Sequence, residues 1–199
     1  MTDAPAIADS PETKEPATET PRLSPIEEPD SWWAQLAYLF ARWDMGTVIT
    51  PLKVVGARFP ESLRLSYEMD KLEKRLTLDP ELRLLVKTLV ATLNGCSFCQ
   101  DIARADADTE DISREKLSVL LDYDTSPAFS EVERAALSYA EEVTRDVGAT
   151  DDTFDALLPH FSEREIVQLT WLIAMENYYN LMNRPLGIGS DNLCELQAP

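Results

Sequence analysis

From residue 32 onward, apolar residues recur at the three- and four-residue spacing of an amphipathic α-helix. The segment Trp32 to Trp43 carries a face of six large apolar side chains: Trp32, Trp33, Leu36, Leu39, Phe40 and Trp43. A face of this kind predicts either core packing or a subunit interface. The same spacing predicts helices over 61–76, 82–93, 96–107 and 151–158.

Polar residues at fixed positions mark the starts of several helices. Asp79 precedes Pro80, the usual order of an N-cap and a first helical residue. Ser130 and Ser162 are each followed three residues later by a glutamate, which is the pattern of a capping box. Ser113 predicts one more start. Because two-residue alternation is absent, we predict an all-α fold of seven or eight helices.

The first 30 residues differ from the rest of the chain. They hold six of the 13 prolines, eight acidic residues and no aromatic residue. Such a stretch buries too little apolar surface to offset the entropy lost on ordering. We therefore predict a disordered acidic tail over 1–30 and one helical domain over 31–199. A docking segment is the alternative interpretation of the tail.

Charge and hydropathy limit the classes of partner. The 18 basic and 36 acidic residues give a net charge of −18, which disfavours binding to nucleic acid or to an anionic membrane. No apolar run approaches the roughly 20 residues needed to span a bilayer. The N-terminal residues lack the basic start and apolar core of a secretory signal. A cytoplasmic protein is the expectation.

Cys96-Ser97-Phe98-Cys99 is the sharpest chemical feature of the sequence. It follows a helix break at Asn94-Gly95 and opens a new helix, whose N-terminus stabilises a thiolate. The spacing allows a disulfide between Cys96 and Cys99, so that one thiolate attacks an oxidant and the other resolves the product. Two buried apolar cysteines are the plain alternative.

A zinc site is disfavoured, because it needs two further ligands. The sequence offers only Cys194 and the single histidine, His160, both far from the cysteine pair. We therefore expect neither a metal nor an organic cofactor.

The stretch from Arg83 to Cys99, with its Asn-Gly-Cys-x-x-Cys element, resembles the carboxymuconolactone decarboxylase and alkylhydroperoxidase D (AhpD-like) family. The flanks are similar too: Phe129 to Leu137 resembles a conserved stretch of that family, and Phe161 to Arg184 resembles its long C-terminal helix. The resemblance runs from about Pro51 to Leu193. It implies an all-helical protein that forms dimers, trimers or hexamers and reduces hydroperoxides with the cysteine pair.

Two polar groups of the family pattern are missing. Active members carry a histidine four residues after the second cysteine, where this chain has Ala103. They also carry a glutamate in the preceding helix, where this chain has Leu84 or Leu85. Glu81 lies a turn too early to replace it. Lys87 could approach the sulfurs or lie in solvent, and Asp101 is predicted to face away from Cys99.

The sequence therefore predicts a thiol-dependent, alkylhydroperoxidase-type antioxidant protein with a hydroperoxide substrate and a dithiol reductant. The resemblance implies that Cys99 attacks the peroxide and Cys96 resolves, whereas the helix terminus alone favours Cys96 as the attacking thiol. The alternative is a non-catalytic helical oligomer of the same family with a binding or regulatory role. Lactone decarboxylation is a third interpretation, which the retained cysteine pair disfavours.

Overall fold

The computed structural model describes residues 20–109 and 114–193. Within these ranges the chain forms eight α-helices, a one-turn π-helix and two short 3₁₀ segments, with no strand. The all-α prediction is therefore confirmed. The elements, in chain order, are α1 (Trp32–Asp44), η1 (Leu52–Gly56), α2 (Glu61–Glu73), α3 (Pro80–Leu93), α4 (Ser97–Thr109), α5 (Arg114–Ser118), η2 (Leu120–Asp122), α6 (Glu131–Asp146), α7 (Asp151–Asp155), α8 (Glu163–Asn183) and η3 (Arg184–Leu186).

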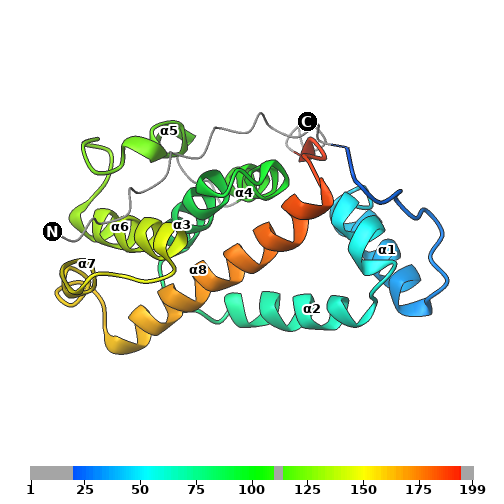
Figure 1. Cartoon of the computed structure of the whole chain (residues 1–199), viewed down its shortest axis with the longest axis horizontal. Helices are drawn as coiled ribbons and strands as arrows, with labels where there is room; N and C mark the ends of the chain where they lie inside the picture. The colour runs from blue at the N-terminus through cyan, green and yellow to red at the C-terminus, as the bar shows by residue number, and fades with distance from the viewer. Residues whose placement is uncertain (1–19, 110–113, 194–199) are drawn as a thin grey trace, which may run out of the picture.

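Helix α3 is the centre of the packing. It contacts α4, α6 and α8, and its fully buried Leu85 and Leu89 belong to the main apolar core. The long α8 crosses the molecule diagonally, with α6 and α7 toward one end and α1 toward the other (Figure 1). Because α3 is covered on several sides, it is apolar around much of its circumference rather than on one stripe.

The predicted helix starts are present where the structure describes them. Asp79 Oδ1 accepts a hydrogen bond from Leu82 N at 3.2 Å. Ser130 and Ser162 each form a complete capping box with the glutamate three residues later. The predicted start at Ser113 lies outside the described residues. Local polar signals therefore fixed the ends of α3, α6 and α8 that orient the core.

Residues 20–31 differ from the predicted solvated tail, because they pack on the helical body. Arg22 N donates to Leu186 O at 2.8 Å, and Ile26 N donates to Lys53 O at 3.1 Å. The buried Tyr38 donates its hydroxyl to Ile26 O at 2.6 Å. Extended backbone can satisfy its polar groups in this way without an apolar repeat. The tail interpretation is thus corrected for residues 20–30; residues 1–19 lie outside the described part.

The aromatic face of α1 is not part of the core. Its six large side chains are exposed in the single chain, and Trp43 is the most exposed at 83%. The opposite side of α1 packs inward through Ala34 and Tyr38. Of the two interpretations of this face, core packing is therefore wrong, and a subunit interface stays a prediction.

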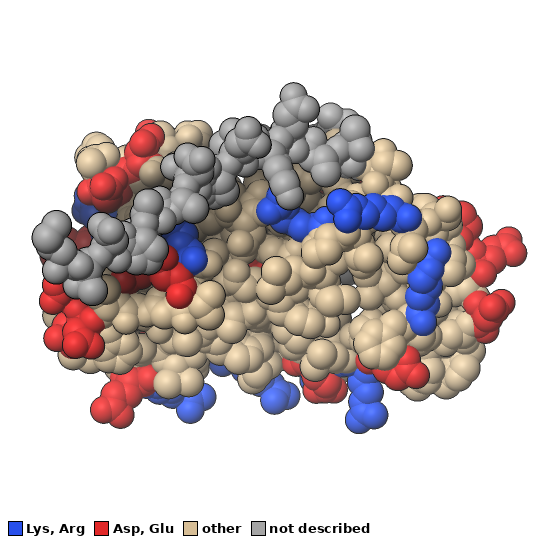
Figure 2. Space-filling model, in the orientation of Figure 1, with Lys and Arg blue, Asp and Glu red and all other residues tan. Residues whose placement is uncertain are grey.

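Charged side chains are unevenly spread over the surface. On the face shown in Figure 2, acidic side chains gather at the two ends, and the middle is mostly uncharged. Across both described ranges, no helix is long and apolar enough to cross a bilayer.

The packed N-terminal segment generates a stability prediction. Removing residues 1–30 deletes the hydrogen bonds to Lys53, Leu186 and Tyr38. We expect the free energy of unfolding to fall by about 2 kcal/mol. The melting temperature should then fall by roughly 4–8 °C. The measurement is thermal unfolding followed by circular dichroism. Removing residues 1–19 is the control, since every one of these contacts stays. Equal melting temperatures for the full chain and the longer deletion would contradict the prediction.

Candidate active site

The two cysteines of the CxxC element lie at the start of α4 and form a disulfide. Their Cα atoms are 5.3 Å apart. The backbone N–H of Cys99 donates a hydrogen bond to Cys96 Sγ at 3.3 Å. Gly95, with φ of +64°, makes the turn that ends α3 and starts α4. This left-handed conformation is costly for a residue with a Cβ atom. The Asn94-Gly95 break therefore sets where the cysteine pair lies.

A cavity of about 290 Å³ lies beside the cysteines, between η1, α2, α3, α4 and α8. Cys99 lines this cavity, whereas Cys96 is not among the lining residues and is only 1% exposed. Most of the wall is apolar and includes Leu52, Val55, Phe98, Ile102, Tyr178 and Met182. The pair thus presents one sulfur to an apolar space and keeps the other within the protein.

Side-chain amides of α8 hold the cysteine turn in place. Asn94 Nδ2 donates to Asn177 Oδ1 at 2.8 Å and to Asn180 Oδ1 at 2.9 Å. Asn183 Nδ2 donates a hydrogen bond to Cys99 Sγ at 3.6 Å. A donor at this position stabilises negative charge on the sulfur. Helix α8 therefore both anchors the turn and contacts its cavity-facing cysteine.

Glu176 is a buried acid in the same cavity wall. It is 5% exposed, and its Oε1 accepts a hydrogen bond from Asn180 at 2.7 Å. Burial raises the pKa of Glu176 to about 7, although the positive charge of Lys87 and the Asn180 hydrogen bond oppose this increase. Sequence reasoning missed this residue. The available signal was that Glu176 is the only charged residue between positions 166 and 181.

Lys87 also lines the cavity, so the solvated-lysine interpretation is wrong. Its Nζ lies 2.8 Å from Glu73 Oε1 of α2. Burial alone would lower the pKa of Lys87, but the charge and hydrogen bond of Glu73 outweigh it and raise the pKa above its ordinary value. Lys87 is therefore a fixed positive charge at neutral pH and cannot accept a proton there.

The positions of the missing family residues come together in space but carry no polar group. Leu84 and Ala103 are buried in one small apolar cluster with Ala107. Leu85 lies in the main core instead. Residue 84 rather than 85 is therefore next to residue 103, and this pair cannot move a proton.

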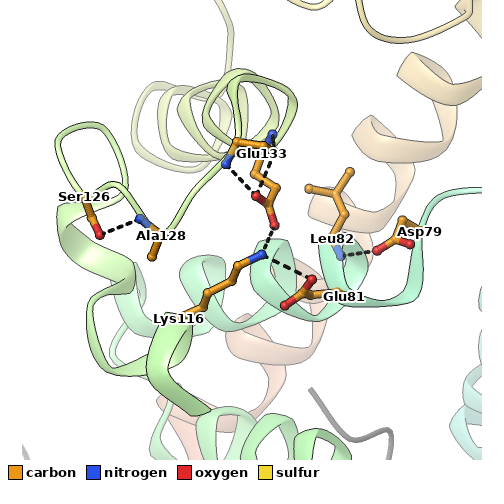
Figure 3. Close-up of polar contacts among 8 residues, drawn as sticks. Asp79, Glu81, Leu82, Lys116, Ser126, Ala128 and Glu133 are labelled. Carbon is orange, nitrogen blue, oxygen red and sulfur yellow. Dashed lines mark hydrogen bonds and ion pairs between the residues drawn. The ribbon is translucent and has the colours of Figure 1, made fainter. Parts of the chain in front are cut away.

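Glu81 is engaged elsewhere and does not reach the thiols. Lys116 Nζ lies 3.2 Å from Glu81 Oε2 and 2.6 Å from Glu133 Oε1, as Figure 3 shows. Glu133 is itself the capping-box residue of α6. Glu81 therefore belongs to a charge cluster that joins α3, α5 and α6.

Asp101 is buried and holds the C-terminal segment. Its Oδ2 accepts hydrogen bonds from Ser190 Oγ at 2.8 Å and from the backbone N–H groups of Asp191 and Leu193 at 3.0 Å. Asp191 in turn accepts from Thr50 N at 2.6 Å. These contacts give Asp101 a structural role at the side of α4.

Of the residues considered for a metal, the structure describes the cysteine pair and His160. His160 is exposed near the end of α7, far along the chain from the cysteines, and Cys194 lies outside the described residues. Among residues 20–109 and 114–193, no three histidine, cysteine or acidic side chains are arranged to hold a metal ion.

Comparisons with known proteins agree with the fold. A sequence model of the carboxymuconolactone decarboxylase family matches residues 60–142. The chain is 33% identical over 174 residues to the uncharacterized protein YnjA of Escherichia coli (strain K12), covering 86% of this chain and 91% of that protein.

Solved structures share the architecture. A protein from Agrobacterium tumefaciens, proposed as an antioxidant defence protein AhpD, has a TM-score of 0.65 and 27% identity, covering 68% of this chain and 94% of that one. The apo debrominase Bmp8 has a TM-score of 0.72 and 19% identity, covering 87% and 96%; at that identity the likeness concerns the fold alone. The chain, with its all-helical fold, thus belongs to the carboxymuconolactone decarboxylase family and is AhpD-like in structure.

Proposed function

We propose that the protein is a thiol-dependent peroxidase of the AhpD type that reduces organic hydroperoxides through Cys96 and Cys99. The observation that carries the proposal is a disulfide-forming pair with one sulfur in the wall of an apolar cavity. The likeness to the Agrobacterium tumefaciens protein proposed as an antioxidant defence protein AhpD supports it.

The chemistry takes three steps, and the last one needs a reductant from solution. A Cys99 thiolate attacks the terminal oxygen of the hydroperoxide, the O–O bond breaks, and an alcohol leaves once its oxygen gains a proton. The resulting Cys99 sulfenic acid is attacked by Cys96, which releases water and forms the disulfide. A dithiol reductant then restores both thiols by exchange.

Cys99 is the attacking residue in this proposal, because a substrate in the cavity meets its sulfur and not that of Cys96. The Asn183 amide adds a donor to the same sulfur. The helix terminus alone favours Cys96, but that sulfur is 1% exposed. Access therefore outweighs the helix dipole in deciding the order of the two thiols.

The cavity wall favours a hydroperoxide with an apolar body. Aromatic and aliphatic side chains from η1, α4 and α8 form most of it. Burying apolar surface contributes about 25 cal/mol per Å², whereas hydrogen peroxide has no such surface to bury. Since turnover also needs a dithiol reductant, we place the protein in a reducing compartment such as the cytosol.

The second candidate function is a non-catalytic helical oligomer with a binding role. It is favoured by the apolar residues at positions 84 and 103, where the family relay is expected. The same cavity would then bind an apolar ligand without chemistry. Peroxide turnover by the purified protein separates the two candidates.

The first prediction from this proposal concerns the two cysteines. With cumene hydroperoxide and excess dithiothreitol, Cys99→Ser loses peroxide consumption, because no attacking thiol remains in the cavity. In a second assay, Cys96→Ser is first reduced and then freed of dithiothreitol; it reacts once with the hydroperoxide and accumulates a Cys99 sulfenic acid, which dimedone traps and mass spectrometry detects. Cys194→Ser is the matched control and keeps the wild-type rate. Trapping on Cys96 in the Cys99 variant would reverse the assignment, and no consumption by wild type would favour the binding role.

The second prediction concerns assembly, for which we propose that the exposed face of α1 joins copies of this chain. Changing Phe40 and Trp43 to serine removes two large exposed side chains, at 65% and 83% exposure, without touching the buried side of α1. We expect the wild type to be oligomeric and this variant to shift toward monomer in light scattering after size exclusion. Leu121→Gln, at a site 63% exposed on η2, is the control and keeps the wild-type mass. A monomeric wild type at micromolar concentration would contradict the prediction.

A further inference from the structure

The proposed chemistry needs a group that moves a proton, and the family positions for it are apolar in this chain. We propose that Glu176 of α8 is this acid–base residue: its carboxylate takes the proton of the Cys99 thiol and returns it to the alkoxide released when the O–O bond breaks. This inference rests on the proposed function and names a residue of the same site. It moves the proton relay from α3 and α4 to α8.

The position of Glu176 follows from the geometry of α8. Glu176, Asn180 and Asn183 are spaced by four and three residues, so they share one face of the helix. Asn183 contacts the Cys99 sulfur, and Glu176 lies two turns before it, about 10 Å along the axis. Both residues line the cavity. At this separation, the proposed proton transfer between the carboxyl and the sulfur runs through the cavity by way of the bound hydroperoxide or a chain of water molecules.

The hydrogen bonding of Glu176 leaves one oxygen for this task. Oε1 is held by Asn180, which also accepts a hydrogen bond from Asn94 beside the cysteine turn. Among the described residues, Oε2 has no hydrogen-bond partner. Because Glu176 lines the cavity, that oxygen is the one offered to a bound molecule. The carboxyl is thus oriented on one side and open on the other.

The charges around Glu176 support a proton that exchanges near neutral pH. Lys87 faces it from α3, Glu73 from α2 and Asp106 from α4, and all three influence its pKa. Burial dominates and raises this pKa to about 7. On α8 itself, burial raises the pKa of Tyr179, which stays protonated. A group with a pKa near the working pH both accepts and donates protons efficiently.

No other group considered for the relay fits the task. Lys87 is held protonated by Glu73, and Glu81 is paired with Lys116. Asp101 is committed to the C-terminal segment. Glu176 is the acid that the cavity lining itself contains.

The protons and electrons balance without a further reactant. The thiol gives its proton to Glu176, and the sulfur gives an electron pair to the terminal oxygen of the hydroperoxide. The O–O bond breaks, the sulfur is oxidised to a sulfenic acid, and the leaving oxygen takes the proton from Glu176. The carboxylate is then regenerated.

The test is the pH dependence of the second-order rate of reduced protein with cumene hydroperoxide. The reactive form holds one proton between Glu176 and Cys99, so the wild-type rate rises with a pKa of about 7. The wild-type rate falls again as the thiol proton is lost, near about 8.5 for an unperturbed cysteine. Glu176→Gln keeps the size and the Asn180 contact but cannot carry the proton. We expect a rate about 10²-fold lower at neutral pH and a profile that rises to a plateau without the falling limb.

Two further variants shift the profile in opposite directions and do not depend on the folding of the glutamine variant. Glu73→Gln removes a negative charge that raises the pKa of Glu176, so the rising limb moves to lower pH. Lys87→Met removes a positive charge that lowers the pKa of Glu176, so the rising limb of the pH profile moves to higher pH. Glu73→Gln is also the matched control for Glu176→Gln. Both variants remove a carboxylate near Lys87, but Glu73 does not line the cavity.

Alkylation of Cys99 by iodoacetamide separates proton transfer from a general effect on the thiol. Alkylation needs the thiolate but no proton donor, so Glu176→Gln leaves its rate nearly unchanged. If peroxide reaction and alkylation slow together, Glu176 only supports the structure around the thiol, and the proposal is wrong. If Glu176→Gln reacts with cumene hydroperoxide at the wild-type rate and keeps the falling limb at high pH, the role of Glu176 is wrong, but the proposed peroxidase function still stands. Absence of peroxide reaction in the wild type overturns the proposed function and this inference with it.

Discussion

The attachment of the α3–α4 turn to α8 is the constraint on which the rest of the site depends. Asn94 ends α3 and uses its amide to contact two amides of α8, while Gly95 supplies the left-handed residue that lets α4 begin at once. Asn180 is 1% exposed, and its amide oxygen and nitrogen are both hydrogen-bonded. A buried amide of this kind fixes one arrangement, because any other leaves polar atoms without partners. The cysteine pair thereby has a defined position against the polar face of α8.

Charges that the chain separates widely in sequence lie together in and beside the cavity. Glu73, Lys87 and Glu176 come from three helices, and burial makes their mutual influence much larger than it is in water. Lys87 is paired with Glu73 at 2.8 Å, and its charge only partly offsets the effect of burial on the pKa of Glu176. Burial, more than the balance of these charges, raises the pKa of Glu176 to about 7 beside an apolar space.

How far the sequence predicts this molecule depends on how local each determinant is. The capping boxes at Ser130 and Ser162, the turn at Gly95 and the cysteine pair are encoded within four residues, and sequence reasoning found them. Glu176 was not predicted from the sequence, because its burial and its neighbours depend on the packing of α8 against α3. The packing of residues 20–31 was not predicted for a related reason. Their backbone hydrogen bonds join them to residues far along the chain, and such bonds leave no periodicity in the sequence.

The depth at which Cys96 is buried has a consequence for how the proposed catalytic cycle would be closed. With this sulfur 1% exposed and its partner in the cavity wall, an incoming reductant can reach the disulfide only from the side of Cys99. Oxidant and reductant must therefore use the same space in turn. A double-displacement cycle follows, with parallel lines in reciprocal plots of rate against either substrate. In the proposed peroxidase, each substrate would inhibit the other at high concentration, so that the ratio of peroxide to dithiol, rather than either alone, would set the flux.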